Sequence, residues 1–184
     1  LQALTDNALE PVGDDTITGL DDVNVELSDD PGSTAADIRA VIDLTNGSVT
    51  ATATDTALAL LLDPAGLTGT GHAITITVDD AVVSASDMND LNAITTVDIT
   101  IDAAVGEITG SAGNIITALT ADGFAGFEAA IDATVNDGNA TVTQVNQIIN
   151  ETTGVITATV STSSLDALGA LNGTNNVLEI FVGD

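Results

Sequence analysis

The residues best suited to chemistry in this chain are pairs of aspartates that follow apolar, alternating segments. Asp29 and Asp30 stand at such a position, as do Asp79 and Asp80, and Asp87 follows shortly after the second pair. Calcium prefers several carboxylate and carbonyl oxygens held in loops, so Asp79, Asp80 and Asp87 form the strongest candidate site. Calcium is therefore the one cofactor that the sequence suggests.

The same carboxylates have a purely structural interpretation. Asp, Ser and Thr cap helices by accepting hydrogen bonds from the first backbone amides, which contributes about 0.5–2 kcal/mol each. The segments Thr34–Asp37, Ser84–Asp87 and Thr141–Gln144 have the form of such caps. Capping is the favoured interpretation, and chelation remains the alternative. The same two alternatives hold for four further acids, Asp14, Asp15, Asp21 and Asp22.

Catalytic chemistry has little support among the residue types. The chain has no Cys, Lys, Tyr or Trp, and it has one histidine, His72, and one arginine, Arg39. A single histidine without cysteine does not make the usual zinc site. Nucleophilic catalysis would also need an activated nucleophile and a cationic stabiliser. We expect Arg39 to pair with Asp43 one helical turn later, and we expect no enzymatic activity.

Charge excludes several classes of partner. The 28 Asp and Glu residues face a single Arg, which gives a net charge of −27. Nucleic acid and anionic membrane surfaces would repel such a chain. The longest apolar stretch, residues 57–62, is far too short to cross a bilayer, so no membrane insertion is expected. With 44% hydrophobic residues and only three Phe, the chain is expected to form an aliphatic core.

The elements that must position these residues repeat along the chain. Each unit of about fifty residues is predicted to contain an alternating strand, a capped helix, a second strand and a second helix. The first strands are predicted at 23–27, 74–78, 131–135 and 178–182, and the second helices near 56–63, 112–120 and 164–171. The inward positions of the second strands match three times: Val49, Ile99 and Ile156; Ala51, Ile101 and Ala158; Ala53, Ala103 and Val160.

This order of elements predicts an α/β fold. Short connections between successive strands and helices build right-handed parallel crossovers. The outward strand positions are Thr and Asp, so helices are expected on one face only. The prediction is a one-sided, mostly parallel sheet or a solenoid with βα turns of about 25 residues. The alternative is an all-β antiparallel sandwich with short helices.

The repeats divide the chain into segments. Residues 1–22 are a partial repeat and acidic connecting loop, 23–72, 73–129 and 130–176 are three repeats, and 177–184 is the first strand of a further unit. Both ends are thus expected to fall within a unit. The last strand, with Leu178, Ile180 and Val182, is expected to offer its edge to another copy or another repeat.

Three stretches carry a resemblance to a known group of proteins. They are Val83–Val97, Ile108–Ala112 and Glu151–Ala158, which combine small, hydroxyl and aliphatic residues. They resemble the degenerate repeats of very large secreted proteins of marine cyanobacteria and other aquatic bacteria, and the likeness covers most of residues 23–184. The resemblance implies a haemolysin-like or surface-layer-like protein that coats cells or forms appendages, commonly in association with calcium.

Two functions follow as expectations. The first is a structural repeat protein of an extracellular filament, surface layer or giant surface protein, which assembles head to tail through edge strands. Its partner would be itself, as a homopolymer or as neighbouring repeats, and its location the cell surface or the medium. The second is a calcium-dependent adhesive module that binds a surface or a glycan.

Overall fold

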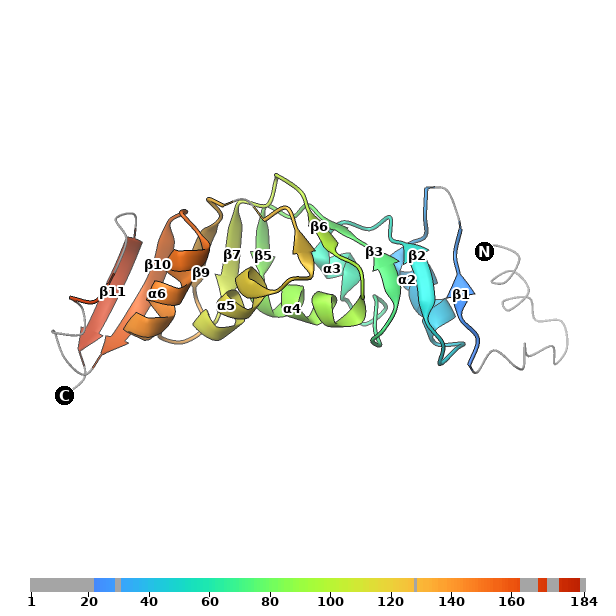
Figure 1. The fold of residues 1–184 in the computed structure, drawn as a ribbon, viewed down its shortest axis with the longest axis horizontal. Coiled ribbons are helices and arrows are strands. Elements are labelled where there is room, and N and C mark those ends of the chain that lie inside the picture. Colours follow the sequence, from blue (N-terminus) through green and yellow to red (C-terminus); the bar gives the residue numbers. More distant parts are fainter. Residues whose placement is uncertain (1–21, 29–30, 128, 163–168, 172–175, 183–184) are drawn as a thin grey trace, which may run out of the picture.

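The chain folds into an elongated stack of turns, here called rungs (Figure 1). The computed structural model describes residues 22–28, 31–127, 129–162, 169–171 and 176–182. Strands and helices alternate along these residues, and every described strand pair is parallel. The predicted α/β class is therefore confirmed. The alternative of an antiparallel sandwich is wrong for the described residues.

The strands form three parallel sheets. The first sheet has the order β1 (Val25–Glu26), β2 (Val49–Thr52) and β3 (Ala73–Thr75). The second has the order β4 (Thr77–Val78), β6 (Ile99–Ile101) and β8 (Phe124–Ala125). The third has the order β11 (Asn176–Val182), β10 (Ile156–Thr162), β9 (Asp132–Val135), β7 (Glu107–Gly110) and β5 (Val82–Ser84). Paired residues lie 20 to 25 positions apart, so one rung takes 20 to 25 residues.

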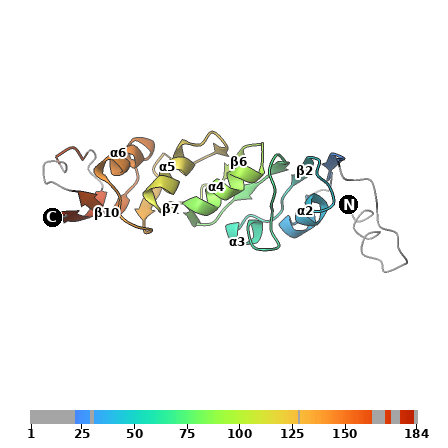
Figure 2. The same ribbon diagram turned by 90° about the horizontal axis from the view of Figure 1, so that it is seen from below.

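Five helices lie in the described part of the stack. They are α2 (Ala35–Ile42), α3 (Leu58–Leu61), α4 (Ala85–Ile94), α5 (Ala112–Thr120) and α6 (Val142–Glu151). Helices α4, α5 and α6 contact one another in sequence and follow each other along the stack (Figure 2). The predicted caps are confirmed, because the side chains of Thr34, Ser84 and Thr141 each accept a hydrogen bond from the backbone amide three residues later.

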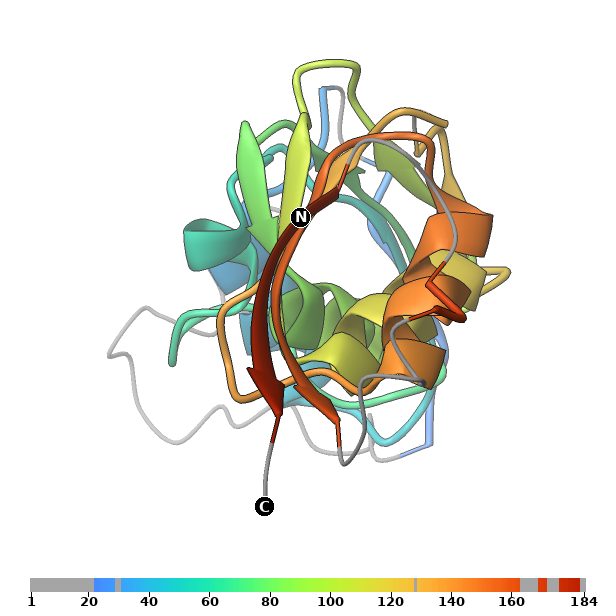
Figure 3. The ribbon, with the colours of Figure 1, turned by 90° about the vertical axis from the view of Figure 1, so that its left-hand side faces the viewer.

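The core is aliphatic, as predicted, and it runs the length of the stack. When the stack is viewed from its end, β10 and β11 curve along one side and α6 lies opposite them (Figure 3). Val83, Ile108, Ala133 and Ile156 are register partners on successive strands, and each is at most 1% exposed. Aliphatic side chains of neighbouring rungs thus cover each other, and each large one contributes about 1.5–3 kcal/mol when it is buried.

The repeat differs from the predicted unit in its middle part. The structural repeat is the single rung: residues 23–72 span two rungs, and the predicted boundary at 130 falls between β8 and β9. The short strands β5, β7 and β8 were not predicted, because two to four residues are too few to show alternation. The prediction that Ala103 points inward is wrong. It is exposed, since β6 ends at Ile101 and the Asp102 carboxylate accepts a hydrogen bond from the Ala104 amide at 2.9 Å.

The predicted second helices have different outcomes. The first, predicted near 56–63, is the shorter α3, and the second matches α5 over 112–120. The third, predicted near 164–171, falls mostly outside the described residues.

Buried threonines join successive rungs where a helix gives way to a strand. Thr45, Thr95 and Thr152 occupy this place in three rungs and are 4% to 8% exposed. The Thr95 hydroxyl donates to the Ile74 carbonyl of the preceding rung at 2.8 Å and accepts from the Val97 amide at 3.3 Å. The other two hydroxyls make the same pair of contacts. Each threonine thus satisfies buried backbone groups in two rungs at once.

Substitution of one bridging threonine tests this arrangement. Thr95→Val keeps the shape of the side chain but leaves buried groups of Ile74 and Val97 without their hydroxyl partner. We expect the free energy of unfolding, measured by urea denaturation, to fall by about 1–3 kcal/mol. Thr100→Val is the matched control, because Thr100 is exposed on β6, and it should change stability by less than about 0.5 kcal/mol. Equal losses in the two variants would contradict the bridging role.

Candidate functional site: the acidic strand ends and the terminal strand

Asp80, the central residue of the candidate calcium site, caps a helix of the neighbouring rung. Its Oδ2 accepts a hydrogen bond of 2.7 Å from the amide of Leu58, the first residue of α3. Asp55 does the same for α2, where the amide of Ala35 donates to its Oδ2 at 2.6 Å. Each carboxylate therefore completes the helix of the preceding rung. Capping was predicted from the sequence, but this direction was not, since the partner lies 20 to 22 residues earlier.

The other two members of the candidate site have separate environments. Asp79 is exposed, and its backbone amide donates to the Thr56 carbonyl at 3.4 Å. Asp87 lies in the first turn of α4, where its amide donates to Ser84 Oγ and its Oδ1 accepts from the hydroxyl of Ser86, both at 3.4 Å. No group of three His, Asp or Glu side chains suited to hold a metal ion occurs among the described residues. Calcium binding stays a prediction.

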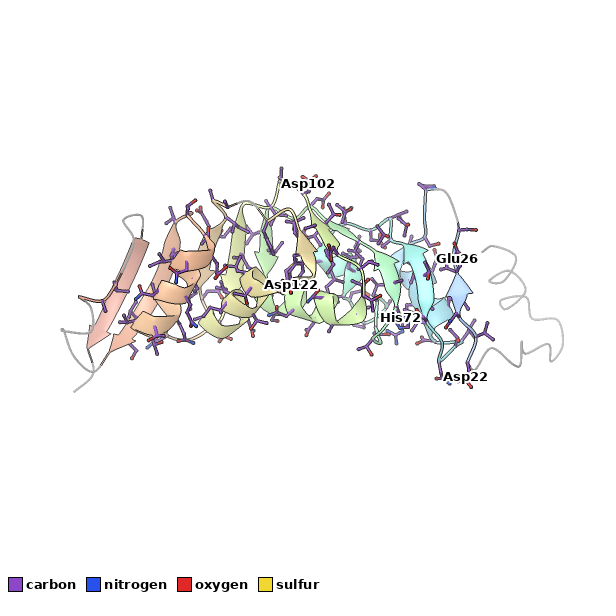
Figure 4. All side chains as sticks on the ribbon, viewed as in Figure 1. Asp22, Glu26, His72, Asp102 and Asp122 are labelled. Atoms are coloured by element: carbon purple, nitrogen blue, oxygen red, sulfur yellow. The ribbon has the colours of Figure 1, made fainter. Side chains whose placement is uncertain are left out.

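The remaining acids are spread along the stack. Asp29 and Asp30 lie outside the described residues, as do Asp14, Asp15 and Asp21, so nothing is said of their surroundings. Figure 4 labels five residues, among them Asp22 and Glu26 near the first rung and Asp102 and Asp122 in the middle of the stack. These four acids are all exposed.

His72 belongs to the contacts between rungs. It is 6% exposed at the turn into β3, and its Nδ1 accepts a hydrogen bond of 3.2 Å from the Val49 amide of the preceding rung. The hydroxyl of Thr96, in the following rung, donates to the His72 carbonyl at 3.1 Å. Burial lowers the pKa of His72 from its ordinary value of 6.5. The neutral ring is therefore the form that fits, because a protonated Nδ1 does not accept a hydrogen bond.

Arg39 pairs with Asp43, as predicted. Its Nε lies 2.9 Å from Oδ1 and 3.0 Å from Oδ2 of that carboxylate, one turn later in the chain. Its Nη1 also donates to the Gly66 carbonyl of the next rung at 3.3 Å, a contact that the sequence did not reveal. The amides of Asn89 and Asn146, which stand at the equivalent position of α4 and α6, likewise donate to backbone carbonyls of the following rung. The predicted equivalence of these three positions thus has a common physical basis.

The terminal strand β11 continues the third sheet. Its backbone pairs in parallel with β10 over seven register positions, from Ile156 with Asn176 to Thr162 with Val182. Leu178, Ile180 and Val182, the residues predicted to form an edge, all lie on this strand. In the sheet order of the described residues, β11 is the last strand.

The backbone pattern of β10 fixes which residues of β11 face outward. The Ala140 amide donates to the Thr159 carbonyl at 2.8 Å, and the Ser161 amide donates to the Ala140 carbonyl at 2.9 Å. The backbone groups of Thr159 and Ser161 therefore face the preceding rung, and those of the residues between them face β11. By the observed register, the backbone groups of Leu178 and Ile180 turn away from β10. These are two of the three predicted edge residues.

The fold and these contacts can be set against known proteins. No match was found. This holds for protein-family models, for curated proteins and for solved structures. Among the described residues, none of the helices has the length and apolar character required to cross a membrane.

Two aspartate variants separate capping from chelation. Asp80→Ala removes the acceptor of the Leu58 amide, so we expect a loss of about 0.5–2 kcal/mol in unfolding free energy, equal in calcium and in chelator. Asp79→Ala removes an exposed carboxylate and should have little effect. Thermal denaturation with and without calcium measures both. A calcium-dependent rise in Tm that both substitutions abolish would instead favour a metal site.

The stability of the chain should depend on the protonation of His72. Its folded-state pKa lies below 6.5, so the unfolded state binds the proton more readily, and stability falls as the pH drops below about 6.5 towards the folded pKa. The lost hydrogen bond suggests a contribution of about 1 kcal/mol. Urea denaturation between pH 7.5 and 5 would measure it.

The control for this prediction is His72→Asn. The amide oxygen of Asn can accept from the Val49 amide but does not titrate. Carboxylates titrate in both proteins, so the difference between the two curves isolates the histidine. Parallel curves would refute the assignment.

Proposed function

We propose that this chain is a structural repeat protein of an extracellular array, in which the parallel stack continues from one repeat to the next. The observation that supports it is the register: the same parallel step of 20 to 25 residues joins rung after rung as far as β11. Solenoids of this kind interact only between neighbouring rungs, so a further rung can be added without changing those already present. In the purified chain, that rung would come from a second copy.

The two ends of the described stack offer complementary edges. The amides of Val25 and Leu27 donate to β2, at 2.9 and 2.8 Å, so the backbone groups of Glu26 between them face away from β2. At the opposite end, those of Leu178 and Ile180 face away from β10. β1 and β11 lie at opposite ends of the elongated stack (Figure 1). A parallel pair of β11 with β1 of the next copy would extend the sheet in one direction.

The charge of the chain suits an extracellular array in a salty medium. A net charge of −27 keeps finished assemblies apart, and ions screen the repulsion within about 8 Å at physiological ionic strength and less in sea water. The proposal needs no cofactor, because the contacts between rungs are hydrogen bonds and aliphatic packing.

Substitution of an outward-facing residue of β11 tests the proposal. Ile180→Pro removes a backbone amide that faces away from β10, which an edge strand tolerates, whereas Ile180→Ala shortens the side chain and keeps the amide. We expect the wild type and the Ala variant to form end-to-end assemblies that lengthen with protein concentration, and the Pro variant to form about tenfold fewer. Electron microscopy and sedimentation velocity would measure them at high salt, in calcium and in chelator.

The controls distinguish the remaining outcomes. Circular dichroism should show that the Pro and Ala variants are folded to the same extent. Assemblies that vanish in chelator would favour calcium as the joining agent. Monodisperse wild-type protein under every condition would refute strand-mediated assembly and leave the calcium-dependent adhesive module.

A further inference from the structure

The outer face of α5 and α6 carries no charge, although the chain as a whole is strongly acidic. The exposed residues of this face, here called the helix face, are Gly113, Thr117 and Thr120 on α5 and Thr143, Gln147 and Asn150 on α6. They occupy matching positions of the two helices, which pack side by side. The helix face is therefore a continuous neutral surface of hydroxyl and amide groups. Charged residues adjoin it only at its borders, at Asp90, Asp122 and Glu151.

The other described surfaces differ in this respect. Exposed acids interrupt the first two sheets, at Glu26, Asp98 and Asp102, and helix α2 exposes Asp37 and Asp43. The third sheet has Asp132 exposed and Glu107 half-buried. Two copies that approach through these surfaces would bring like charges together, which costs several kcal/mol when the charges are desolvated.

We propose that the helix face is a lateral contact site for a second copy of this chain. The occupant follows from charge, because two chains of −27 can approach closely only where neither presents a carboxylate. Hydroxyl and amide groups both donate and accept hydrogen bonds, so the face is complementary to itself. A twofold axis would set α5 of one copy against α6 of the other and close the assembly at a dimer.

The lateral contact is independent of end-to-end assembly. The helices follow one another along the length of the stack, whereas β1 and β11 lie at its ends (Figures 1 and 2). A pair joined through the helix face would leave both terminal strands accessible. Stacks that grow end to end would then be able to associate side by side.

Sedimentation equilibrium of matched charge variants tests the site. Gln147→Glu with Thr117→Asp adds two carboxylates to the helix face without a large change in helix propensity. Asn46→Asp with Thr100→Asp adds the same two charges at exposed positions elsewhere. We expect the face variant to weaken dimerisation at least about tenfold at 0.15 M NaCl and to recover at 1 M NaCl, where the Debye length is about 3 Å. The control variant should dimerise within about twofold of the wild type.

Repeating the measurement with Ile180→Pro separates lateral from end-to-end contacts. A dimer that persists in this variant and is lost with the helix-face charges supports the lateral site, even if no filament ever forms. A wild type that is monomeric at all salt and protein concentrations would overturn the proposal and leave the face to another occupant, such as a neutral glycan. Equal weakening in the face and control variants would also overturn it.

Discussion

The structure depends on one constraint: a rung does not satisfy its own backbone. Parallel strands have their hydrogen-bond partners in neighbouring rungs, so each turn of the chain is complete only when the next has been laid against it. The bridging threonines, His72 and the capping aspartates all act at the corners where the regular ladder is interrupted. Their partners lie about one rung away in sequence. These side chains set the register, and the register brings aliphatic residues into continuous columns in the core.

The features that could be predicted from the sequence are those with a short range. Helix starts at Thr34, Ser84 and Thr141 are visible because a cap and its amide lie three residues apart. The ion pair of Arg39 with Asp43 follows from one helical turn. The α/β class follows from the order of strand and helix patterns, since short connections leave few other topologies.

The features that were missed depend on the neighbouring rung. Nothing local distinguishes Asp80, which caps a helix that begins 22 residues earlier, from an acid that would cap the following helix or bind a metal. The partner of His72 is likewise set by the register. The extra strands of the middle rungs are recognisable only once a parallel partner is in place, because an isolated pair or triplet of residues carries no periodicity. A known step between rungs would have revealed all of these.

The direction of the aspartate caps has a consequence for synthesis. Asp55 and Asp80 reach backward to helices that emerged earlier from the ribosome, so the first amide of α2 and of α3 acquires its partner only when the next rung arrives. A nascent chain would therefore consolidate in order from its amino-terminal side, with each arriving rung locking the one before it. Such vectorial folding suits a long repetitive polypeptide, because the growing part always has a finished template on which to settle and little opportunity to pair with a distant, identical repeat.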